Sequence, residues 1–382
     1  MTMAAVRIDN LVVKIAELCN LRCSYCYLYE HGDSTYRERP RLMSYKVFEA
    51  LLERVRRYCD AEPARQTSLT FHGGEPTLVG PDRLCYFAER ARAVLGPRLG
   101  DLLMQTNGTL IDDRWVQALR SARVHASISL DGPPDIHDHN RIDHAGQGSH
   151  AAAIRGLRLL QAGGLRPGVL AVVAPGVDGA RVYRHFRELG LDSIDLLLPD
   201  ISHDSRDAWY GKCGPSPVAS YLIPAFDAWF DEDDPDVHVR LFYGLLRRMI
   251  GGPMTSDAFG NPALSYLIIE TDGSIQPNDA LRVCENGMTS TVANVFDDDF
   301  DDLGQKAPLA HKLLTRGIPL SAACRACSEL DVCGGGYMPH RYSKMNGFDN
   351  PSAWCEDIKL LLAHLRTRAA LPLAVSSGTT LR

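Results

Sequence analysis

Short apolar runs alternate with amphipathic stretches along the first half of the chain. The apolar runs predict strands at 11–16, 68–72, 101–106, 124–130, 168–173 and 193–198, and helical periodicity predicts helices at 44–58, 81–95, 112–121, 149–163 and 178–189. Six β/α repeats with short connections predict a parallel sheet, open or curled into part of a (β/α)6 barrel. Ligands bind such sheets at the carboxyl ends of the strands, so polar motifs that follow strands are the candidates for chemistry.

The pattern changes after residue 200. A loop comes first and two helical stretches follow it, and a cysteine-rich region then opens with the hairpin-like "YLIIETDGSIQP", in which Asp272-Gly273 is a turn signal. The last residues are rich in Ser, Thr and Gly. The sequence therefore predicts an α/β partial barrel over 1–200, a bridging region over 201–263, an auxiliary domain over 264–365 and a flexible tail over 366–382.

Composition narrows the functional classes. The chain has 382 residues, of which 45% are hydrophobic and 23% charged, as in ordinary globular proteins. The formal net charge of −6 argues against a nucleic-acid-binding surface. No apolar run predicts a membrane span, and the N-terminus lacks the apolar core of a signal peptide. In a chain that is not exported, 11 cysteines predict metal or redox ligands and a cytoplasmic location.

Three cysteines follow the first predicted strand with the spacing Cys19-x3-Cys23-x2-Cys26. Three thiolates within eight residues can hold a four-iron cluster by three of its irons, which leaves the fourth iron open to a small molecule. A structural zinc site with a fourth ligand elsewhere, or three buried thiols, would fit the same residues. Tyr25 and Tyr27 lie beside the cysteines and are expected either to contact the cofactors or only to pack within the loop.

With this motif the chain resembles the radical S-adenosylmethionine (SAM) enzymes. The resemblance implies a 4Fe-4S cluster on Cys19, Cys23 and Cys26, with SAM bound to the open iron through its amino and carboxylate groups. It further implies that one electron from the reduced cluster cleaves SAM and forms a 5′-deoxyadenosyl radical.

The second predicted strand ends in "FHGGEP". Gly73 and Gly74 permit close approach of the backbone to a ligand, and Glu75 supplies a carboxylate. Gly-Gly-Glu-Pro can also be a plain turn. The resemblance implies that it binds the amino group of SAM.

Three further strand ends carry polar side chains. Asn107 is a candidate contact to the cofactor, and Ser129 and Asp131 are candidates for the SAM ribose or carboxylate, although Asn-Gly and Asp-Gly are also common turns. The stretch 137–150 is rich in His and Asp, but its spacing fits no standard metal site. We expect it to be a loop that caps the cofactor, with its histidines at the surface and Arg141 paired with the methionyl carboxylate.

A second cysteine set near the C-terminus reads Cys324-x2-Cys327-x5-Cys333, with Cys355 further along. Four thiolates are a complete set for one iron–sulfur cluster or one zinc ion. The order and spacing resemble the SPASM domain of peptide-modifying radical SAM enzymes, which implies an auxiliary 4Fe-4S cluster with no open iron.

The chain departs from a full SPASM domain, which holds two auxiliary clusters. It has Tyr337 at the position of a further cysteine, and Pro277-Asn278-Asp279 where that family reads Pro-Cys-Asp, with only Cys284 nearby. One auxiliary cluster is therefore predicted. The remaining cysteines are expected to be packing or surface thiols: Cys59, Cys85 and Cys213.

Asp279 is the candidate catalytic residue. The resemblance to the sulfatase-maturing enzymes implies that it accepts the proton released when an electron leaves the substrate. A solvent-exposed aspartate at a hairpin end would read the same way.

Over roughly residues 9 to 360 the chain resembles the SPASM maturases that form three-residue cyclophanes in ribosomally made precursor peptides (RiPPs). The resemblance implies a carbon–carbon bond between an aromatic ring and a side-chain β-carbon, a precursor peptide with a leader as partner, and flavodoxin or ferredoxin as electron donor. An edge strand in the bridging region or the 264–277 hairpin is expected to bind the leader. The alternatives are sulfatase-type formylglycine formation, thioether formation or epimerisation, and a non-catalytic iron–sulfur scaffold.

Overall fold

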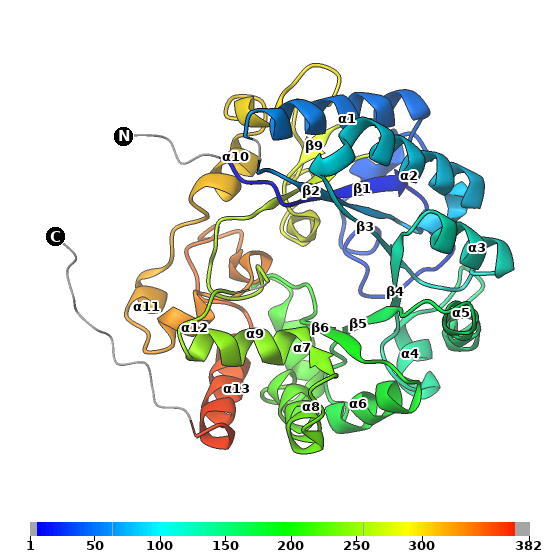
Figure 1. Ribbon diagram of the computed structural model, residues 1–382. Helices are drawn as coiled ribbons and strands as arrows, with labels where there is room; N and C mark the ends of the chain where they lie inside the picture. The colour runs from blue at the N-terminus through cyan, green and yellow to red at the C-terminus, as the bar shows by residue number, and fades with distance from the viewer. Residues whose placement is uncertain (1–5, 63, 255, 371–382) are drawn as a thin grey trace. The chain divides into compact units, whose positions relative to one another are not determined.

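The structure is a computed structural model that describes residues 6–62, 64–254 and 256–370 (Figure 1). Its contacts divide the chain into two compact units. Unit 1 joins Met1–Ala171 to Ala263–Gly317, and unit 2 joins Val172–Pro262 to Ile318–Arg382. Both units are discontinuous in sequence, and the four domain bounds expected above stay a prediction. The expected tail begins within helix α13 (Cys355–Arg368), and its residues 371–382 lie outside the described part.

Unit 1 is built on a mostly parallel sheet with the strand order β5-β4-β3-β2-β1-β8-β9. β1 to β5 and β8 run parallel, and β9 pairs antiparallel with β8. The strands are β1 (Asn10–Ala16), β2 (Thr67–Gly73), β3 (Leu99–Thr106), β4 (His125–Ser129), β5 (Gly168–Val172), β8 (Tyr266–Ile269) and β9 (Ile275–Gln276). The predicted α/β class with a parallel sheet is confirmed, and β1 to β5 lie within two residues of their predicted bounds.

The hairpin β8–β9 occupies a place that the sequence did not indicate. It extends the sheet of unit 1 beside β1, with Val13 opposite Ile269. The hairpin itself and its turn are as predicted, because Gly273 has a φ of +88°, which glycine adopts without strain. Local pattern specifies a hairpin but not the strand that it will pair with, which depends on a register between distant segments.

Helices cover the sheet of unit 1 on the face that carries its apolar residues. These helices are α1 (Tyr45–Asp60), α2 (Pro81–Leu95), α3 (Asp113–Ser121), α4 (Pro134–Asn140), α5 (His150–Ala162) and α10 (Pro308–Thr315). Figure 1 shows α1 and α2 along β1, β2 and β3. Phe48 of α1 packs on Phe71 of β2 and Phe87 of α2, with ring centroids 6.3 and 4.3 Å apart. The side chain of Ser44 caps α1 by accepting the Val47 N–H.

Short 3-10 helices connect these elements. They are η1 (Thr35–Glu38), η2 (Pro76–Val79), η3 (Gly96–Arg98), η4 (Asp279–Val283) and η5 (Phe300–Asp302). One expectation for unit 1 is corrected. The stretch 137–150 begins inside α4 instead of forming a single loop, because Pro134 starts a helix whose apolar side buries Ile136 and His137.

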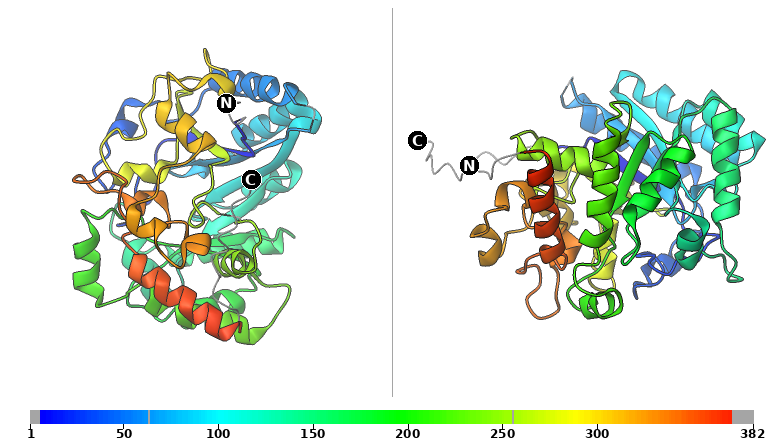
Figure 2. Two further views of the ribbon diagram at one scale, coloured as in Figure 1. Left: turned by 90° about the vertical axis from the view of Figure 1, so that its left-hand side faces the viewer. Right: turned by 90° about the horizontal axis from the view of Figure 1, so that it is seen from below.

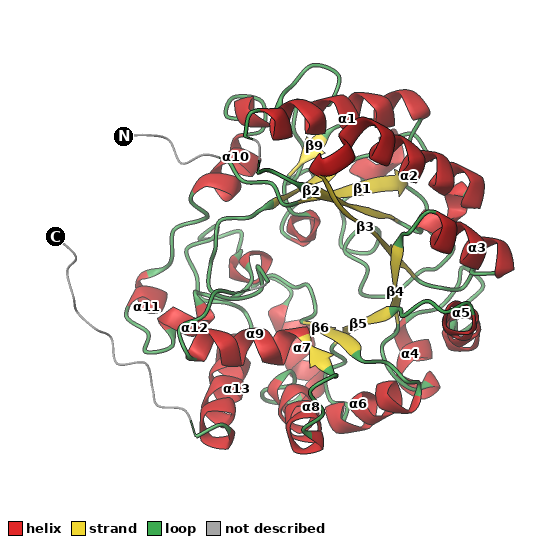
Figure 3. Cartoon of the chain, in the orientation of Figure 1, coloured by secondary structure: helices red, strands yellow, loops and turns green. Residues whose placement is uncertain are grey.

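Unit 2 is mainly helical (Figures 2 and 3). Its two strands, β6 (Ser193–Leu197) and β7 (His238–Val239), pair in parallel. Its helices are α6 (Gly179–Glu188), α7 (Arg206–Cys213), α8 (Ala219–Glu232), α9 (Arg240–Met249), α11 (Ala322–Arg325), α12 (Leu330–Cys333), η6 (Met338–Arg341) and α13. β6, α6, α8 and α9 match their predictions, whereas α7 falls where a loop was expected. The Asp357 side chain accepts the N–H groups of Val218 and Ala219, so α13 caps the start of α8.

In the part of the chain that the structure describes, no helix is long and apolar enough to cross a membrane.

Candidate functional site

The Cys19, Cys23 and Cys26 thiols lie together on the loop that follows β1. The Leu21 N–H points at the Cys19 sulfur from 3.3 Å, and the three thiols act on one another electrostatically. Burial raises the pKa of Cys19 to about 12 and that of Cys26 to about 11. As free thiols they would stay protonated, so binding of iron must displace their protons, as thiolate–metal sites generally do.

Glu75 ties the ends of β2 and β3 together beneath this loop. Its carboxylate is buried and accepts four hydrogen bonds, from Thr77 N (2.9 Å) and Oγ1 (2.5 Å), Thr106 Oγ1 (2.6 Å) and Asn107 N (2.8 Å). Three of these reach Oε1 and only one reaches Oε2. A carboxylate has about four lone-pair positions, two on each oxygen, so Oε2 keeps an acceptor position for an ammonium group.

The two glycines before Glu75 are required by the chain itself. A Cβ on Gly73 would lie 1.9 Å from the Ala16 carbonyl oxygen, and one on Gly74 would lie 2.1 Å from the Tyr29 hydroxyl. The β2 end therefore packs directly against the backbone that leads into the cysteine loop. Direct contact of these glycines with a ligand stays a prediction.

Asn107 orients the cysteine loop from the end of β3. Its Nδ2 donates to the Asn20 side chain at 2.9 Å and lies 3.9 Å from the Cys19 sulfur, while its Oδ1 accepts from Thr109. The sequence indicated a polar contact here. The structure places that contact on the loop between the first two cysteines.

Tyr25, Asp131 and Arg141 form a second polar group at the loop. The Tyr25 hydroxyl donates to Asp131 Oδ2 at 2.5 Å and accepts from Arg141 Nη1 at 2.7 Å. Burial raises the pKa of Tyr25, so the phenol stays neutral. Tyr25 is thus more than loop packing. Arg141 Nε is buried without a hydrogen-bond partner among the described residues, so it can still donate to an anionic ligand.

Two neighbouring residues complete this part of the site. Ser129 Oγ accepts from Gln105 Nε2 at 2.8 Å on the same strand ends. His137, expected at the surface, is fully buried and bonds to Ser149 Oγ at 3.0 Å, which corrects that expectation. His139 and His144 are exposed, as expected, and His150 is half-buried.

The four C-terminal cysteines line one cavity in unit 2. The cavity has a volume of about 640 Å³, and its walls include Cys324, Cys327, Cys333 and Cys355. Burial raises the pKa of Cys333 to about 12. Arg206 and Lys359 also line the cavity, which suits it to a group that carries negative charge. Four thiolates around one enclosed volume fit a 4Fe-4S cluster.

Among the described residues, no three His, Cys, Asp or Glu side chains are close enough to share one metal ion. A four-iron cluster makes a different demand, because each cysteine binds its own iron.

The position that holds cysteine in a full SPASM domain has a structural task in this chain. Asn278 is buried, and its Oδ1 accepts the Ala280 N–H at 2.8 Å, which caps η4. Cys284, at the other end of η4, is also buried. Cys59 is buried in α1 and Cys85 is partly buried in α2, while the side chain of Cys213 lies outside the described part.

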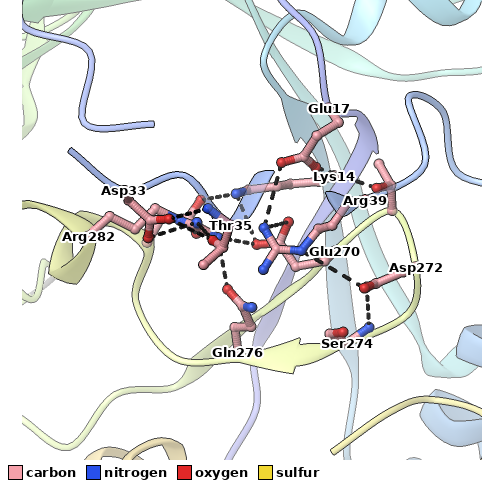
Figure 4. A network of polar contacts seen from close by, with 12 residues as sticks. Lys14, Glu17, Asp33, Thr35, Arg39, Glu270, Asp272, Ser274, Gln276 and Arg282 are labelled. Carbon is pink, nitrogen blue, oxygen red and sulfur yellow. Dashed lines mark hydrogen bonds and ion pairs between the residues drawn. The ribbon is translucent and has the colours of Figure 1, made fainter. Parts of the chain in front are cut away.

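Asp279 belongs to a buried network of charges in unit 1, part of which is drawn in Figure 4. Lys14 Nζ lies 3.0 Å from Glu270 Oε1 and 3.1 Å from Asp279 Oδ2. Arg282 Nη2 lies 2.8 Å from Glu270 Oε1, and its Nε lies 3.6 Å from Asp279 Oδ1. Asp279 is therefore not the exposed hairpin-end residue that the sequence left open. Burial opposes its ionisation, but Lys14 and Arg282 prevail and hold its pKa below the usual value.

The network continues through Arg39, which lies 3.5 Å from Glu270 Oε2 and 3.7 Å from Glu17 Oε1. Burial raises the pKa of Glu17 to about 7. Three cations face four buried carboxylates here: Lys14, Arg39 and Arg282 against Glu17, Asp33, Glu270 and Asp279. Sequence reasoning did not single out this set, although one signal was present, a lysine in the middle of the apolar strand "LVVKIA".

Comparison with known proteins identifies the class. Residues 13–194 match the family model of the radical SAM superfamily. The chain is 33% identical over 357 residues to a serine-type anaerobic sulfatase-maturating enzyme of Klebsiella pneumoniae, covering 86% of this chain and 81% of that protein. It is 25% identical over 361 residues to a cysteine-type anaerobic sulfatase-maturating enzyme of Clostridium perfringens (strain 13 / Type A), covering 92% and 94%.

Solved structures agree with this result. The fold is similar to native anSMEcpe with bound AdoMet and Kp18Cys peptide, with a TM-score of 0.80, 25% identity and coverage of 94% of this chain and 98% of that chain. It also resembles Streptococcus suis SuiB bound to precursor peptide SuiA, with a TM-score of 0.61, 15% identity and coverage of 92% and 77%, a likeness of fold alone.

The chain therefore belongs to the radical SAM superfamily, whose members are enzymes that use a 4Fe-4S cluster and SAM. Within that superfamily it belongs to the family that contains the anaerobic sulfatase-maturating enzymes, which modify proteins or peptides.

Proposed function

We propose that this protein oxidises a side chain of a peptide or protein at its β-carbon, and that the product is an aldehyde of the formylglycine type. The observation that carries this proposal is the 33% identity to the serine-type sulfatase-maturating enzyme across 86% of the chain. These relatives favour the sulfatase-type alternative over the cyclophane chemistry expected from the sequence.

The assignment of residues to cofactors is part of the proposal. The loop cysteines hold the SAM-binding cluster, Glu75 Oε2 and Arg141 Nε meet the amino and carboxylate groups of SAM, and the four C-terminal thiolates hold one auxiliary cluster. When bound, these groups supply a 5′-deoxyadenosyl radical and a one-electron acceptor. The support is the vacant acceptor position on Glu75, the unpaired donor on Arg141 and the four-thiol cavity.

The chemistry of the substrate balances as follows. A hydrogen atom leaves the β-carbon of a serine or cysteine, and the resulting carbon radical then loses one electron and the proton of its hydroxyl or thiol. The new C=O or C=S bond completes a two-electron oxidation. The electron goes to an acceptor of the iron–sulfur class, and the proton goes to a base of the protein.

A second candidate is the three-residue cyclophane. Asn278 and Tyr337 replace cysteines of the full SPASM pattern, and Asn278 is used as a helix cap, so this chain lacks ligands for a second auxiliary cluster at those positions. This departure favours a chemistry other than that of the relatives. The β-carbon radical would add to a neighbouring aromatic ring, which then loses one electron and one proton to regain aromaticity.

Peptide binding, the leader and the electron donor belong to the same proposal. The β8–β9 hairpin is a candidate for binding a leader by strand addition, but Ile275 N–H already donates to the Ala293 carbonyl at 2.9 Å. A leader would therefore have to use the remaining groups of this edge. Flavodoxin or ferredoxin is the proposed donor, and the cytoplasm the proposed location.

The test uses the reconstituted enzyme under anaerobic conditions with SAM and dithionite. Its substrates are the Kp18Cys peptide, its serine analogue, and a peptide encoded by a short neighbouring reading frame with repeated aromatic-x-x motifs. An aldehyde product reacts with a hydrazide probe. A crosslinked product loses two hydrogens without gaining that reactivity. Unchanged peptides despite formation of 5′-deoxyadenosine would overturn both candidates.

A further inference from the structure

His72 stands on the polar face of the unit 1 sheet, at the end of β2. Phe71 and Leu69 turn their side chains to the helix-covered core, so Thr70 and His72 turn to the opposite face, because side chains alternate along a strand. In the register, Lys14 of β1 lies directly opposite His72. Lys14 in turn contacts Glu270 on the next strand, so a polar row crosses β8, β1 and β2.

This row leads to the strand ends that surround the cysteine loop. His72 immediately precedes Gly73-Gly74-Glu75, and Gly73 packs on the backbone just before that loop. On the far side of β2, Gln105 of β3 lies opposite Ser127 of β4 and bonds to Ser129. His72 therefore occupies the face to which Ser129 and the other proposed cofactor contacts belong.

The imidazole of His72 has a nitrogen to spare. Its Nδ1 is buried and has no hydrogen-bond partner among the described residues. Burial lowers the pKa of His72, so the ring is neutral near pH 7, and one of its two nitrogens is then a proton acceptor. The charged groups that face it are Asp279 and Glu270, which favour its protonated form, and Lys14, which opposes that form.

Asp279 is placed differently. Its carboxylate lies between Lys14 and Arg282, which hold it in the ionised form and make it a weak base. The same negative charge stabilises a proton on the neighbouring imidazole. A neutral imidazole beside a fixed carboxylate is an effective proton acceptor, because the carboxylate offsets the charge that develops on the ring.

We propose that His72 accepts the proton released in the oxidation of the substrate radical, and that Asp279 is a positioning residue that acts through His72. This inference rests on the proposed function. In the step, the hydroxyl or thiol proton of the substrate passes to the ring nitrogen, one electron leaves to an iron–sulfur acceptor, and the carbon–heteroatom double bond forms. Asp279 gains no proton.

The experiment compares wild type with His72→Gln, which keeps a polar side chain but removes the base. His139→Gln is the matched control, because His139 is exposed on α4. Each holoenzyme is incubated with SAM, dithionite and the serine analogue of Kp18Cys, and both 5′-deoxyadenosine and oxidised peptide are quantified over a range of pH. Binding of labelled peptide, measured by fluorescence anisotropy, gives a readout that does not depend on turnover.

We expect His72→Gln to keep its peptide affinity and its 5′-deoxyadenosine formation while losing about 100-fold or more of product, the usual contribution of general base catalysis. The ratio of 5′-deoxyadenosine to product rises accordingly. The rising limb of the wild-type pH profile disappears in this variant, and added imidazole restores product to His72→Ala. His139→Gln behaves as wild type.

Each other outcome overturns the inference in a distinct way. If wild type forms product and His72→Gln matches it in yield and pH profile, only the role of His72 falls. If both His72 variants retain iron but form no 5′-deoxyadenosine, His72 serves the cofactor site and not the proton. If wild type oxidises no peptide while cleaving SAM, the proposed function falls and the role of His72 falls with it.

Discussion

The two cysteine regions of this chain differ in what surrounds their sulfurs. Cys19, Cys23 and Cys26 share a loop with Tyr25, and that loop is held by the polar strand-end residues Asn107 and Asp131. The four C-terminal cysteines instead line a cavity of about 640 Å³ whose walls carry Arg206 and Lys359.

The difference concerns what each region leaves available. Around the loop, Arg141 Nε and Glu75 Oε2 retain the capacity to bond to a ligand. Around the cavity, the protein supplies a fourth thiolate in place of such groups. A cluster that must bind a small molecule needs both a missing ligand and polar groups to orient the molecule. A cluster that only accepts electrons needs neither.

The largest expected effect comes from breaking the loop set. Cys26→Ala should abolish 5′-deoxyadenosine formation, because the SAM-binding cluster cannot assemble on two thiolates. Iron should fall from about eight to about four atoms per chain. Cys85→Ser is the matched control and should leave both quantities unchanged. Retention of SAM cleavage in Cys26→Ala would show that these cysteines do not hold the open cluster.

Breaking the cavity set should separate initiation from oxidation. Cys333→Ala should also lose about four irons but continue to form 5′-deoxyadenosine, while oxidised peptide falls to background because the electron acceptor is missing. High-performance liquid chromatography of the nucleoside and mass spectrometry of the peptide measure the two quantities. If peptide oxidation survives the loss of iron, this set has a purely structural role.

The buried charges of unit 1 allow a sharper test of the support beneath the loop. Arg282 has no exposed surface and contacts Asp33, Glu270 and Asp279. Arg282→Met should lower the free energy of unfolding by about 3 to 5 kcal/mol, because it leaves buried carboxylates unpaired. Arg7→Met, which removes an exposed pair with Asp9, should have almost no effect. Equal urea midpoints for the two variants would contradict the importance of the network.

The smallest expected effect contrasts two buried acids. Cations lower the pKa of Asp279 in unit 1, whereas in unit 2 burial, with a contribution from Asp257, raises that of Asp200 from 3.8 to about 7. Between those two pH values folded Asp200 binds a proton that the unfolded chain has released, so the free energy of unfolding falls as the pH rises from about 4 to about 7.

Asp200→Asn removes this titration. It should exceed wild type in stability at pH 8 by about 1 to 3 kcal/mol, with a smaller difference at pH 5. Urea unfolding at the two pH values measures the effect. Parallel pH dependences for the two proteins would place the titration on another group.

The fold and the cluster ligands were accessible to sequence reasoning for different reasons. Strands such as 68–72 and helices such as 81–95 carry their period in adjacent residues, so their bounds could be predicted closely. The cysteine sets were recognised by spacing alone. The reasoning failed at His137, whose burial follows from a short helix that starts at Pro134 within a stretch that otherwise reads as polar loop.

The sequence by itself determined the alternating β/α order, the two cysteine sets and the superfamily, because each is written in neighbouring residues or fixed spacings. Only the tertiary structure brought Lys14 to Glu270, 256 positions away, and so revealed that Asp279 is a buried, ion-paired carboxylate. Only the strand register set His72 opposite Lys14 with a nitrogen unpaired. The protonation of a buried group depends on the charges packed around it, and those charges come from segments whose pairing no local pattern records.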